Sequence, residues 1–93
     1  MWLIREADCT SIDLAGVNAV FGYENTPGDW VVVAERGEEG IVVVCGLKSQ
    51  REATWLVALL TYELAGSAVR AVSDTTLRQA VAAMMEEEAR GAN

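Results

Sequence analysis

Residues 49–65 most limit how this chain can fold, because they predict one uninterrupted helix with apolar side chains on two faces. The start has the pattern of a capping box, in which the Ser49 hydroxyl accepts from the Glu52 amide and the Glu52 carboxylate accepts from the Ser49 amide. No Gly or Pro interrupts the helix before Gly66, which predicts its end. Two apolar stripes follow helical spacing, one of Ala53, Leu56, Val57, Leu60 and Leu64 and one of Trp55, Ala58, Leu59 and Tyr62. Both stripes have to be covered, so a sheet under one face is not enough.

The preceding part of the chain, residues 1–46, predicts a β-sheet. Two segments rich in β-branched residues, 30–34 and 41–45, are joined by a short charged linker that contains glycine, which predicts an antiparallel hairpin. Pro27-Gly28 predicts a type II turn before this hairpin. Further strands are expected in three shorter stretches, 2–5, 11–14 and 19–24. We therefore expect an α+β domain whose roughly five strands form an antiparallel meander, with the long helix packed on one face and a second helix at the C-terminus.

The second helix is predicted over residues 74–89. Its apolar stripe consists of Leu77, Ala80, Val81, Met84 and Met85. Three consecutive glutamates, 86–88, lie where the helix dipole disfavours negative charge, so we expect the last turn to fray and residues 91–93 to be loose. Residues 67–72 fit either a short edge strand or a helical turn, and their Ala and Arg content slightly favours the turn. The prediction is one domain over residues 1–90.

The composition excludes several classes of function. Apolar residues make up 52% of the 93 residues and the net charge is −7, which is typical of a folded acidic domain and unfavourable for direct binding to nucleic acid. The chain has no His, and Cys9 and Cys45 are too far apart for a Cys-x-x-Cys metal or redox motif. No apolar run approaches the roughly 20 residues of a membrane span, and the first residues lack a signal-peptide pattern. We therefore expect a cytoplasmic protein with reduced cysteines and no membrane partner.

No group of residues predicts catalysis, a metal site or a cofactor. Glu35, Glu38 and Glu39 lie in the hairpin linker without the alternating Asp and Asn ligands of a calcium loop. Ser and Thr hydroxyls have no partner base, since His is absent and Lys48 is the only lysine. We therefore predict that the protein is not an enzyme.

The turn at residues 45–51 has the composition of a weak anion site. It joins the last predicted strand to the helix start and contains Gly46, Lys48, Ser49 and Arg51 next to free helix N–H groups. A small anion such as a nucleotide is one candidate ligand. A capped turn without any ligand is the alternative that explains the same residues.

The second apolar stripe of the long helix predicts an interface. Trp55 and Tyr62 lie on this stripe, and buried aromatic side chains dominate the binding energy of many protein interfaces. The predicted seam combines residues of both helices: Trp55, Leu59, Tyr62, Leu77, Val81, Met84 and Met85. Two arrangements remain open, because either the second helix of the same chain or a second subunit would cover this stripe.

The order of these segments resembles that of small uncharacterised bacterial and phage proteins. The matching pieces lie within residues 1–65 and are Met1-Trp2-Leu3-Ile4, Ile12-Asp13-Leu14, Trp30-Val31-Val32-Val33-Ala34, Ile41-Val42-Val43-Val44 and Ser49-Gln50-Arg51-Glu52-Ala53. The resemblance implies a shared fold and no activity, ligand or catalytic residue, and it ends before the second helix.

Three functional hypotheses follow from these observations. The first is a non-catalytic interaction protein that acts as a homodimer through the predicted seam. The second, from the phage-like resemblance and the acidity, is a small inhibitor whose negative surface occupies a basic groove of a host protein. The third is binding of a small anion at the turn before the long helix.

Overall fold

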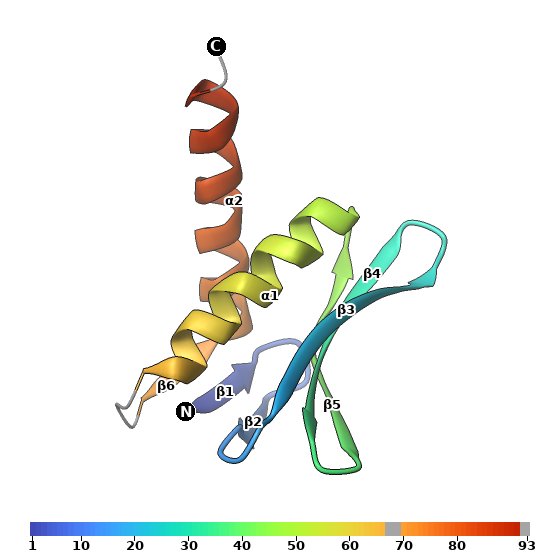
Figure 1. Ribbon diagram of the computed structural model, residues 1–93, viewed down its shortest axis with the longest axis vertical. Coiled ribbons are helices and arrows are strands. Elements are labelled where there is room, and N and C mark those ends of the chain that lie inside the picture. Colours follow the sequence, from blue (N-terminus) through green and yellow to red (C-terminus); the bar gives the residue numbers. More distant parts are fainter. Residues whose placement is uncertain (67–69, 92–93) are drawn as a thin grey trace.

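Six strands and two helices make up the part of the chain that the structure describes, residues 1–66 and 70–91 of a computed structural model (Figure 1). The elements are β1 (Trp2–Arg5), β2 (Thr10–Asp13), β3 (Ala19–Thr26), β4 (Asp29–Arg36), β5 (Glu39–Leu47), α1 (Gln50–Ala65), β6 (Ala71–Ser73) and α2 (Asp74–Gly91). The strands form two three-stranded sheets, sheet A with the order β2-β1-β6 and sheet B with the order β3-β4-β5. The predicted α+β class, with a long helix packed on an antiparallel sheet, is confirmed.

Sheet B is the antiparallel hairpin region that the β-branched segments predict. Its register places Phe21 of β3 opposite Val33 of β4, and Val33 opposite Val42 of β5. Between β3 and β4, Gly28 has a φ of +81°, which a type II turn at Pro27-Gly28 requires. The strands and the turn predicted for this region are confirmed.

Because of sheet A, the predicted meander of about five strands is only an approximate description. β1 pairs antiparallel with β2 and parallel with β6, so the described residues contain a second sheet of mixed direction. The chain leaves β2 through a turn in which Gly16 has a φ of +80°, a conformation that side chains disfavour. Arg36, at the end of β4, donates to the carbonyls of Asp13 (2.9 Å) and Ala15 (3.2 Å). These bonds hold the turn against sheet B without continuing the strand ladder, and this break separates the two sheets.

Residues 71–73 form strand β6, although the composition of 67–72 favours a helical turn. β6 pairs in parallel with β1, with Leu3 opposite Val72. Val72 is 6% exposed in this position, and the burial of a β-branched side chain beside Leu3 stabilises the extended conformation. The helical prediction is therefore wrong for residues 71 and 72, and its residues 67–69 lie outside the described part of the chain.

α1 begins where the capping box predicts. The Ser49 hydroxyl accepts from the Glu52 amide at 3.1 Å. The Glu52 carboxylate accepts from the Lys48 amide at 3.3 Å instead of the predicted Ser49 amide. At the other end Gly66 is extended, and its amide donates to the Glu63 carbonyl at 3.2 Å. The helix therefore ends at the predicted residue, with a hydrogen-bonded turn in place of a left-handed glycine.

α2 follows β6 directly and is longer than predicted. The Ser73 hydroxyl accepts from the Thr76 amide at 3.1 Å and caps the helix. The helix continues to Gly91, two residues past the predicted end, and the two residues after it lie outside the described part. Arg90 pairs with Glu86 one turn earlier, which offsets part of the unfavourable charge at this end.

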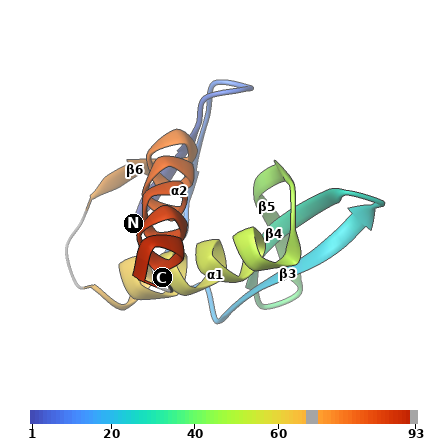
Figure 2. The same cartoon turned by 90° about the horizontal axis from the view of Figure 1, so that it is seen from above.

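The core lies where α1 and α2 meet the two sheets. Figure 2 shows α1 extending from α2 and sheet A at one end to sheet B at the other. The largest fully buried side chains come from both sheets, both helices and the link after β2: Leu3, Leu14, Val32, Val43, Val44, Leu47, Leu56, Leu60, Leu77 and Val81. Neither α1 nor α2, the helices of the described residues, is long and apolar enough to cross a lipid bilayer.

Candidate functional site

The second apolar stripe of α1 is only partly covered. Tyr62 is 76% exposed, whereas Trp55 and Leu59 are half-buried and pack against the core. On the first stripe, by contrast, Leu56 and Leu60 are completely buried. α1 thus has one face that belongs to the core and a second face that is still open at Tyr62.

α2 covers part of this second stripe. Leu77 and Val81, which the sequence assigns to the seam, are each 2% exposed and belong to the core of the same chain. Both side chains therefore leave almost no surface for contact with a second subunit. The seam residues that keep exposed surface are Trp55, Leu59, Tyr62, Met84 and Met85.

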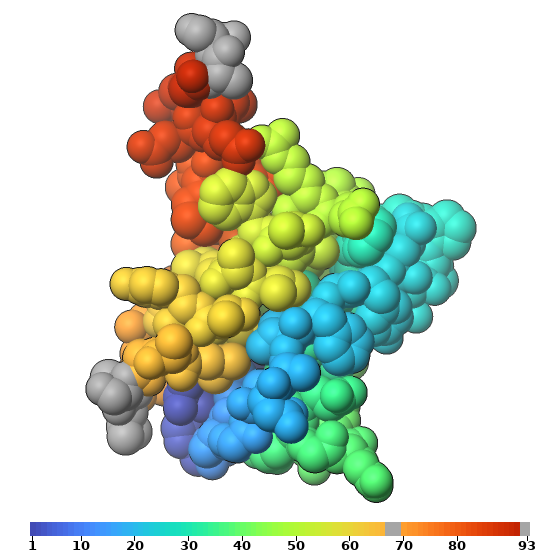
Figure 3. All heavy atoms as spheres, in the orientation of Figure 1, coloured from blue at the N-terminus to red at the C-terminus, as the bar shows by residue number. Residues whose placement is uncertain are grey.

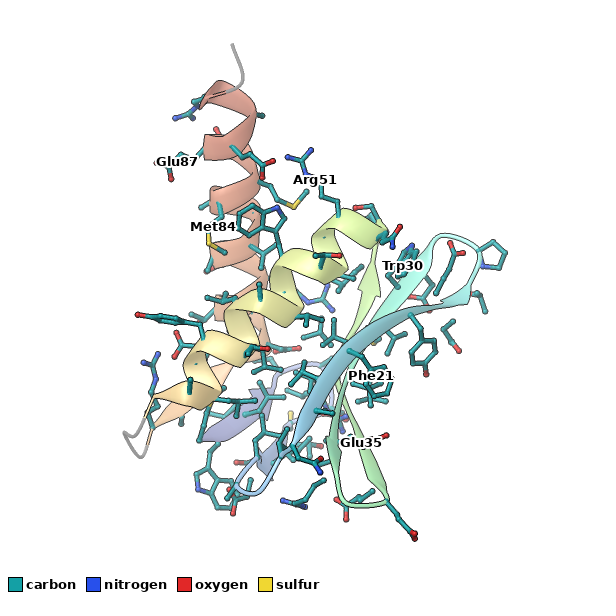
Figure 4. All side chains as sticks on the ribbon, in the orientation of Figure 1. Phe21, Trp30, Glu35, Arg51, Met84 and Glu87 are labelled. Atoms are coloured by element: carbon teal, nitrogen blue, oxygen red, sulfur yellow. The ribbon has the colours of Figure 1, made fainter. Side chains whose placement is uncertain are left out.

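The second half of α2 projects beyond the rest of the molecule (Figures 1 and 3). Val81 is the last buried residue of the helix, and every residue in 82–91 is exposed or half-buried. Arg51 points from α1 towards this projecting half, and its Nη2 lies 2.7 Å from Oε1 of Glu88, whereas Glu87 points away on the other side of the helix (Figure 4). The two helices border an open hollow of about 530 Å³ lined by Gln50, Arg51, Thr54, Trp55, Ala58 and Glu88.

The turn predicted as a weak anion site holds carboxylates of its own chain. The residues of that prediction are Gly46, Lys48, Ser49 and Arg51, which lie together between β5 and the first turn of α1. The Gly46 amide donates to the Asp29 carboxylate at 2.9 Å, and the Lys48 amide donates to the Glu52 carboxylate at 3.3 Å. The Arg51 guanidinium is directed to α2 by its ion pair. These carboxylates occupy donors that a bound anion would need, so no observation here favours an anionic ligand.

Ion pairs within the chain neutralise most of its few cations. Five of the seven basic side chains form the ion pairs Arg5–Asp8, Arg36–Glu39, Arg51–Glu88, Arg70–Glu63 and Arg90–Glu86. Arg78 donates to the backbone carbonyl of Cys45. Most of the fourteen carboxylates have no cationic partner within residues 1–66 and 70–91, so the surface potential is negative.

The carboxylates do not form a metal site in the described part of the chain. No group of three or more Cys, Asp or Glu side chains comes together there, the hairpin glutamates included. At Asp8, hydrogen bonding to Thr10 and then the Arg5 guanidinium, 2.7 Å away, hold the pKa of the carboxyl below its ordinary value. The Asp8 side chain is about half exposed, and its perturbation belongs to a surface turn.

A second apolar surface, on sheet B, is missed by the sequence analysis. Phe21 and Tyr23 are 40% and 43% exposed, and the centroids of their rings lie 6.4 Å apart. They alternate along β3 with Gly22, whose Cα packs against Ala53 of α1, so the two rings lie on the opposite face of the strand. Figure 4 shows Phe21 directed away from α1. The period-2 pattern at Ala19, Phe21 and Tyr23 is the sequence signal that would have revealed this surface.

A shallow groove follows β3 on its other side, between the strand and α1. Two hollows of about 300 and 240 Å³ lie along it, and Val20 lines both. α1 contributes one stripe at helical spacing, formed by Gln50, Thr54, Val57, Thr61 and Leu64. Because this stripe mixes polar and apolar residues, it does not stand out as an apolar pattern, and the sequence analysis does not detect it.

Comparisons of the chain with protein-family models, with curated proteins and with solved structures found no match. The resemblance to small phage and bacterial proteins therefore stays an expectation. What the protein does has to be inferred from the surfaces just described.

Proposed function

We propose that the chain is a non-catalytic protein-interaction module that acts as a homodimer through the open part of the second α1 stripe. The observation that carries this proposal is Tyr62. Its side chain is 76% exposed, whereas the other exposed large hydrophobic side chains of residues 1–66 and 70–91 lie between 39% and 43%. Buried Tyr and Trp side chains are frequent hot spots of interfaces, and Trp55 lies two helical turns away on the same stripe.

The projecting half of α2 supports the same assembly. Isolated helices shorter than about 12–15 residues are marginally stable in water. Residues 82–91 extend past the last buried residue, and their contacts with the body include Met84, Met85 and the ion pair of Glu88. In the proposed dimer, a second copy lies along the second α1 stripe, where it covers Tyr62, and also packs against the methionines of this half. Methionine side chains adapt well to such contacts because they are flexible and polarisable.

The test is the mass of the protein in solution, measured by light scattering after size exclusion at micromolar concentration. We expect a dimer for the unchanged chain and a monomer for Tyr62→Asp, because the carboxylate would be buried without a partner. Tyr23→Asp is the matched control, since it makes the same change on sheet B, and it should leave the dimer intact. A folded monomer at these concentrations for the unchanged chain would overturn the proposal.

A second candidate function is binding to a basic surface of another protein, as a small acidic inhibitor would. It is favoured by the pairing of arginines with carboxylates of the same chain, which leaves the remaining carboxylates to determine the surface potential. Complementary charge speeds association and makes it sensitive to salt. The test is recovery of basic proteins from a host lysate on the immobilised chain at low and at high salt. Recovery of no partner at low salt would count against this function.

A further inference from the structure

We infer that the free edge of β3 and the adjoining side of α1 form a docking groove for an extended segment of a partner protein, in which Lys or Arg alternates with small apolar residues. The inference rests on the second candidate function, binding of a basic partner, and assigns it a surface and a mode of binding. It is independent of dimer formation through Tyr62.

The groove has the length and position that an added strand needs. Its two hollows adjoin at Val20 and extend from Trp30 and Gln50 at one end to Val17 and Leu64 at the other. Figure 3 shows β3 and α1 side by side on one face of the molecule. A segment lying between them would run along the first half of the strand, residues 19–22.

The two edges of sheet B differ in whether their backbone groups are already used. At the β5 edge, Arg5 donates to the Val42 carbonyl at 2.8 Å and Arg78 donates to the Cys45 carbonyl. At the β3 edge, no group of residues 1–66 and 70–91 outside β4 hydrogen-bonds to the strand backbone. Alternate residues of an edge strand direct their N–H and C=O groups outward, where an extended peptide can pair with them. β3 is therefore the edge at which a strand can be added.

The wall formed by α1 accepts apolar side chains even though it contains threonines. The Thr54 hydroxyl donates to the Gln50 carbonyl at 2.9 Å, and the Thr61 hydroxyl donates to the Val57 carbonyl at 2.7 Å. With both hydroxyls used within the helix, their methyl groups and Val57 remain for contact. The strand and helix approach closely at Gly22, where an added Cβ would lie 3.3 Å from the Cβ of Ala53. Side chains as small as valine fit such a shallow wall better than aromatic ones.

Charge identifies the occupant as basic. Residues 6–35 contain six carboxylates and no Lys or Arg, and none of the residues that line the groove is charged. The cation next to this segment is Arg36, whose guanidinium is already used by the Asp13 and Ala15 carbonyls and by Glu39. On the outer face of the sheet, Phe21 and Tyr23 present exposed rings, and Glu35 lies in register with Ala19 on that same face. Aromatic faces and a carboxylate both attract cations. A second copy of β3 would bring Glu24 and no cation to this edge, so charge favours a basic partner over self-pairing.

The test uses two capped synthetic peptides, Gly-Lys-Val-Lys-Val-Lys-Val-Gly and its counterpart with Glu at every Lys position. Binding is measured by titration calorimetry, and the site by hydrogen exchange of backbone amides followed by NMR. We expect the Lys peptide to bind, to protect amides of β3 and to lose affinity between roughly 0.05 M and roughly 0.5 M salt, as screening predicts. The Glu peptide should not bind.

Two variants locate the site, both at exposed helix positions that accept Arg. Thr54→Arg places a cation and a long side chain in the groove and should weaken binding of the Lys peptide about five- to tenfold. Gln79→Arg makes the same change in charge on α2 and should leave the affinity of that peptide unchanged apart from a small effect of net charge.

Several results would overturn the inference in distinguishable ways. If Thr54→Arg and Gln79→Arg weaken binding of the Lys peptide equally, the peptide binds outside the groove. The inferred docking site would then be wrong, whereas the second candidate function, binding of a basic partner, would remain supported. If neither peptide binds, both the docking groove and the second candidate function would be contradicted. Equal binding of both peptides would contradict the charge argument.

Discussion

The two halves of α2 have the same kind of apolar stripe and different surroundings. In the first half, Leu77 and Val81 are buried in the core. In the second half, Met84 and Met85 reach the core only at its edge, and the helix extends past α1. The first half of α2 directly follows β6, which belongs to sheet A. In the second half, no segment of the described part of the chain covers the side of the helix that faces away from α1. A stripe at helical spacing therefore predicts that cover is needed and does not predict whether the same chain supplies it.

The largest expected effect is in the first half. Leu77→Ala should lower the free energy of unfolding by about 2–5 kcal/mol, because it leaves a cavity in a core that cannot fully collapse. Urea denaturation measures this change. Met84→Ala, the matched truncation in the second half, should cost less than half as much in dilute solution. Equal costs would show that the two halves are equally packed.

The stability of variants in the two halves of α2 should depend differently on protein concentration. If a second copy covers Met84 and Tyr62, folded dimer is favoured by mass action, and the stability of the unchanged chain rises with protein concentration. The cost of Met84→Ala should then increase over the same range, whereas the cost of Leu77→Ala should stay nearly constant. Thermal melts over a wide concentration range measure both, and identical behaviour of the two variants would contradict the dimer seam.

A smaller effect is expected at the ion pair that joins the second half to α1. Glu88→Gln should lower the free energy of unfolding by about 0.2–1 kcal/mol, since both partners are about half exposed. Glu87→Gln is the control, because Glu87 points away from α1 and forms no ion pair with Arg51 (Figure 4). Both substitutions remove one negative charge from the C-terminal end of the helix, where the helix dipole disfavours it. The difference between the variants should shrink at high salt. A difference that does not depend on salt would mean that packing, and not charge, links Arg51 to the helix.

The smallest effect concerns the turn that holds the start of α2. The pKa of Asp8 lies below its ordinary value of 3.8, so its contribution to stability is present above that pH and is lost as the pH falls through the lower folded value. Thr10→Val removes the larger cause and should move the pKa of Asp8 back towards 3.8, as followed by carboxyl NMR. The Glu6 amide in this turn donates to the Asp74 carboxylate at 3.1 Å. Amide signals near Asp74 should follow the titration, and signals beyond Val81 should not.

Local patterns account for the parts of the fold that the sequence predicts. The capping box at Ser49 and the turn at Pro27-Gly28 depend on neighbouring residues, and both elements occur at the predicted positions. β6 is not predicted because its three residues gain stability from β1, at the other end of the chain. Its local composition resembles a helical turn, and only the burial of Val72 against sheet A decides otherwise.

The candidate surfaces show the same limit. The second stripe of α1 is visible in the sequence, yet the division between buried Leu77 and exposed Tyr62 depends on where α2 crosses α1. The groove along β3 is not visible at all, because its walls come from two elements that are separated in the chain. The threonines that line it present their methyl groups to the groove only because their hydroxyls donate to carbonyls of the same helix.

The parallel pairing of β1 with β6 also sets an order of events during synthesis. Sheet A is complete only when Trp2 has paired with Ala71 and Leu3 with Val72, whereas each strand of sheet B pairs with a strand next to it in the chain. Because closing a long loop is slow compared with forming a hairpin, the nascent chain should first fold as a β3–α1 unit with β1 and β2 unanchored. A released chain truncated before residue 70 would then resist proteolysis from β3 onward and remain sensitive near Leu3.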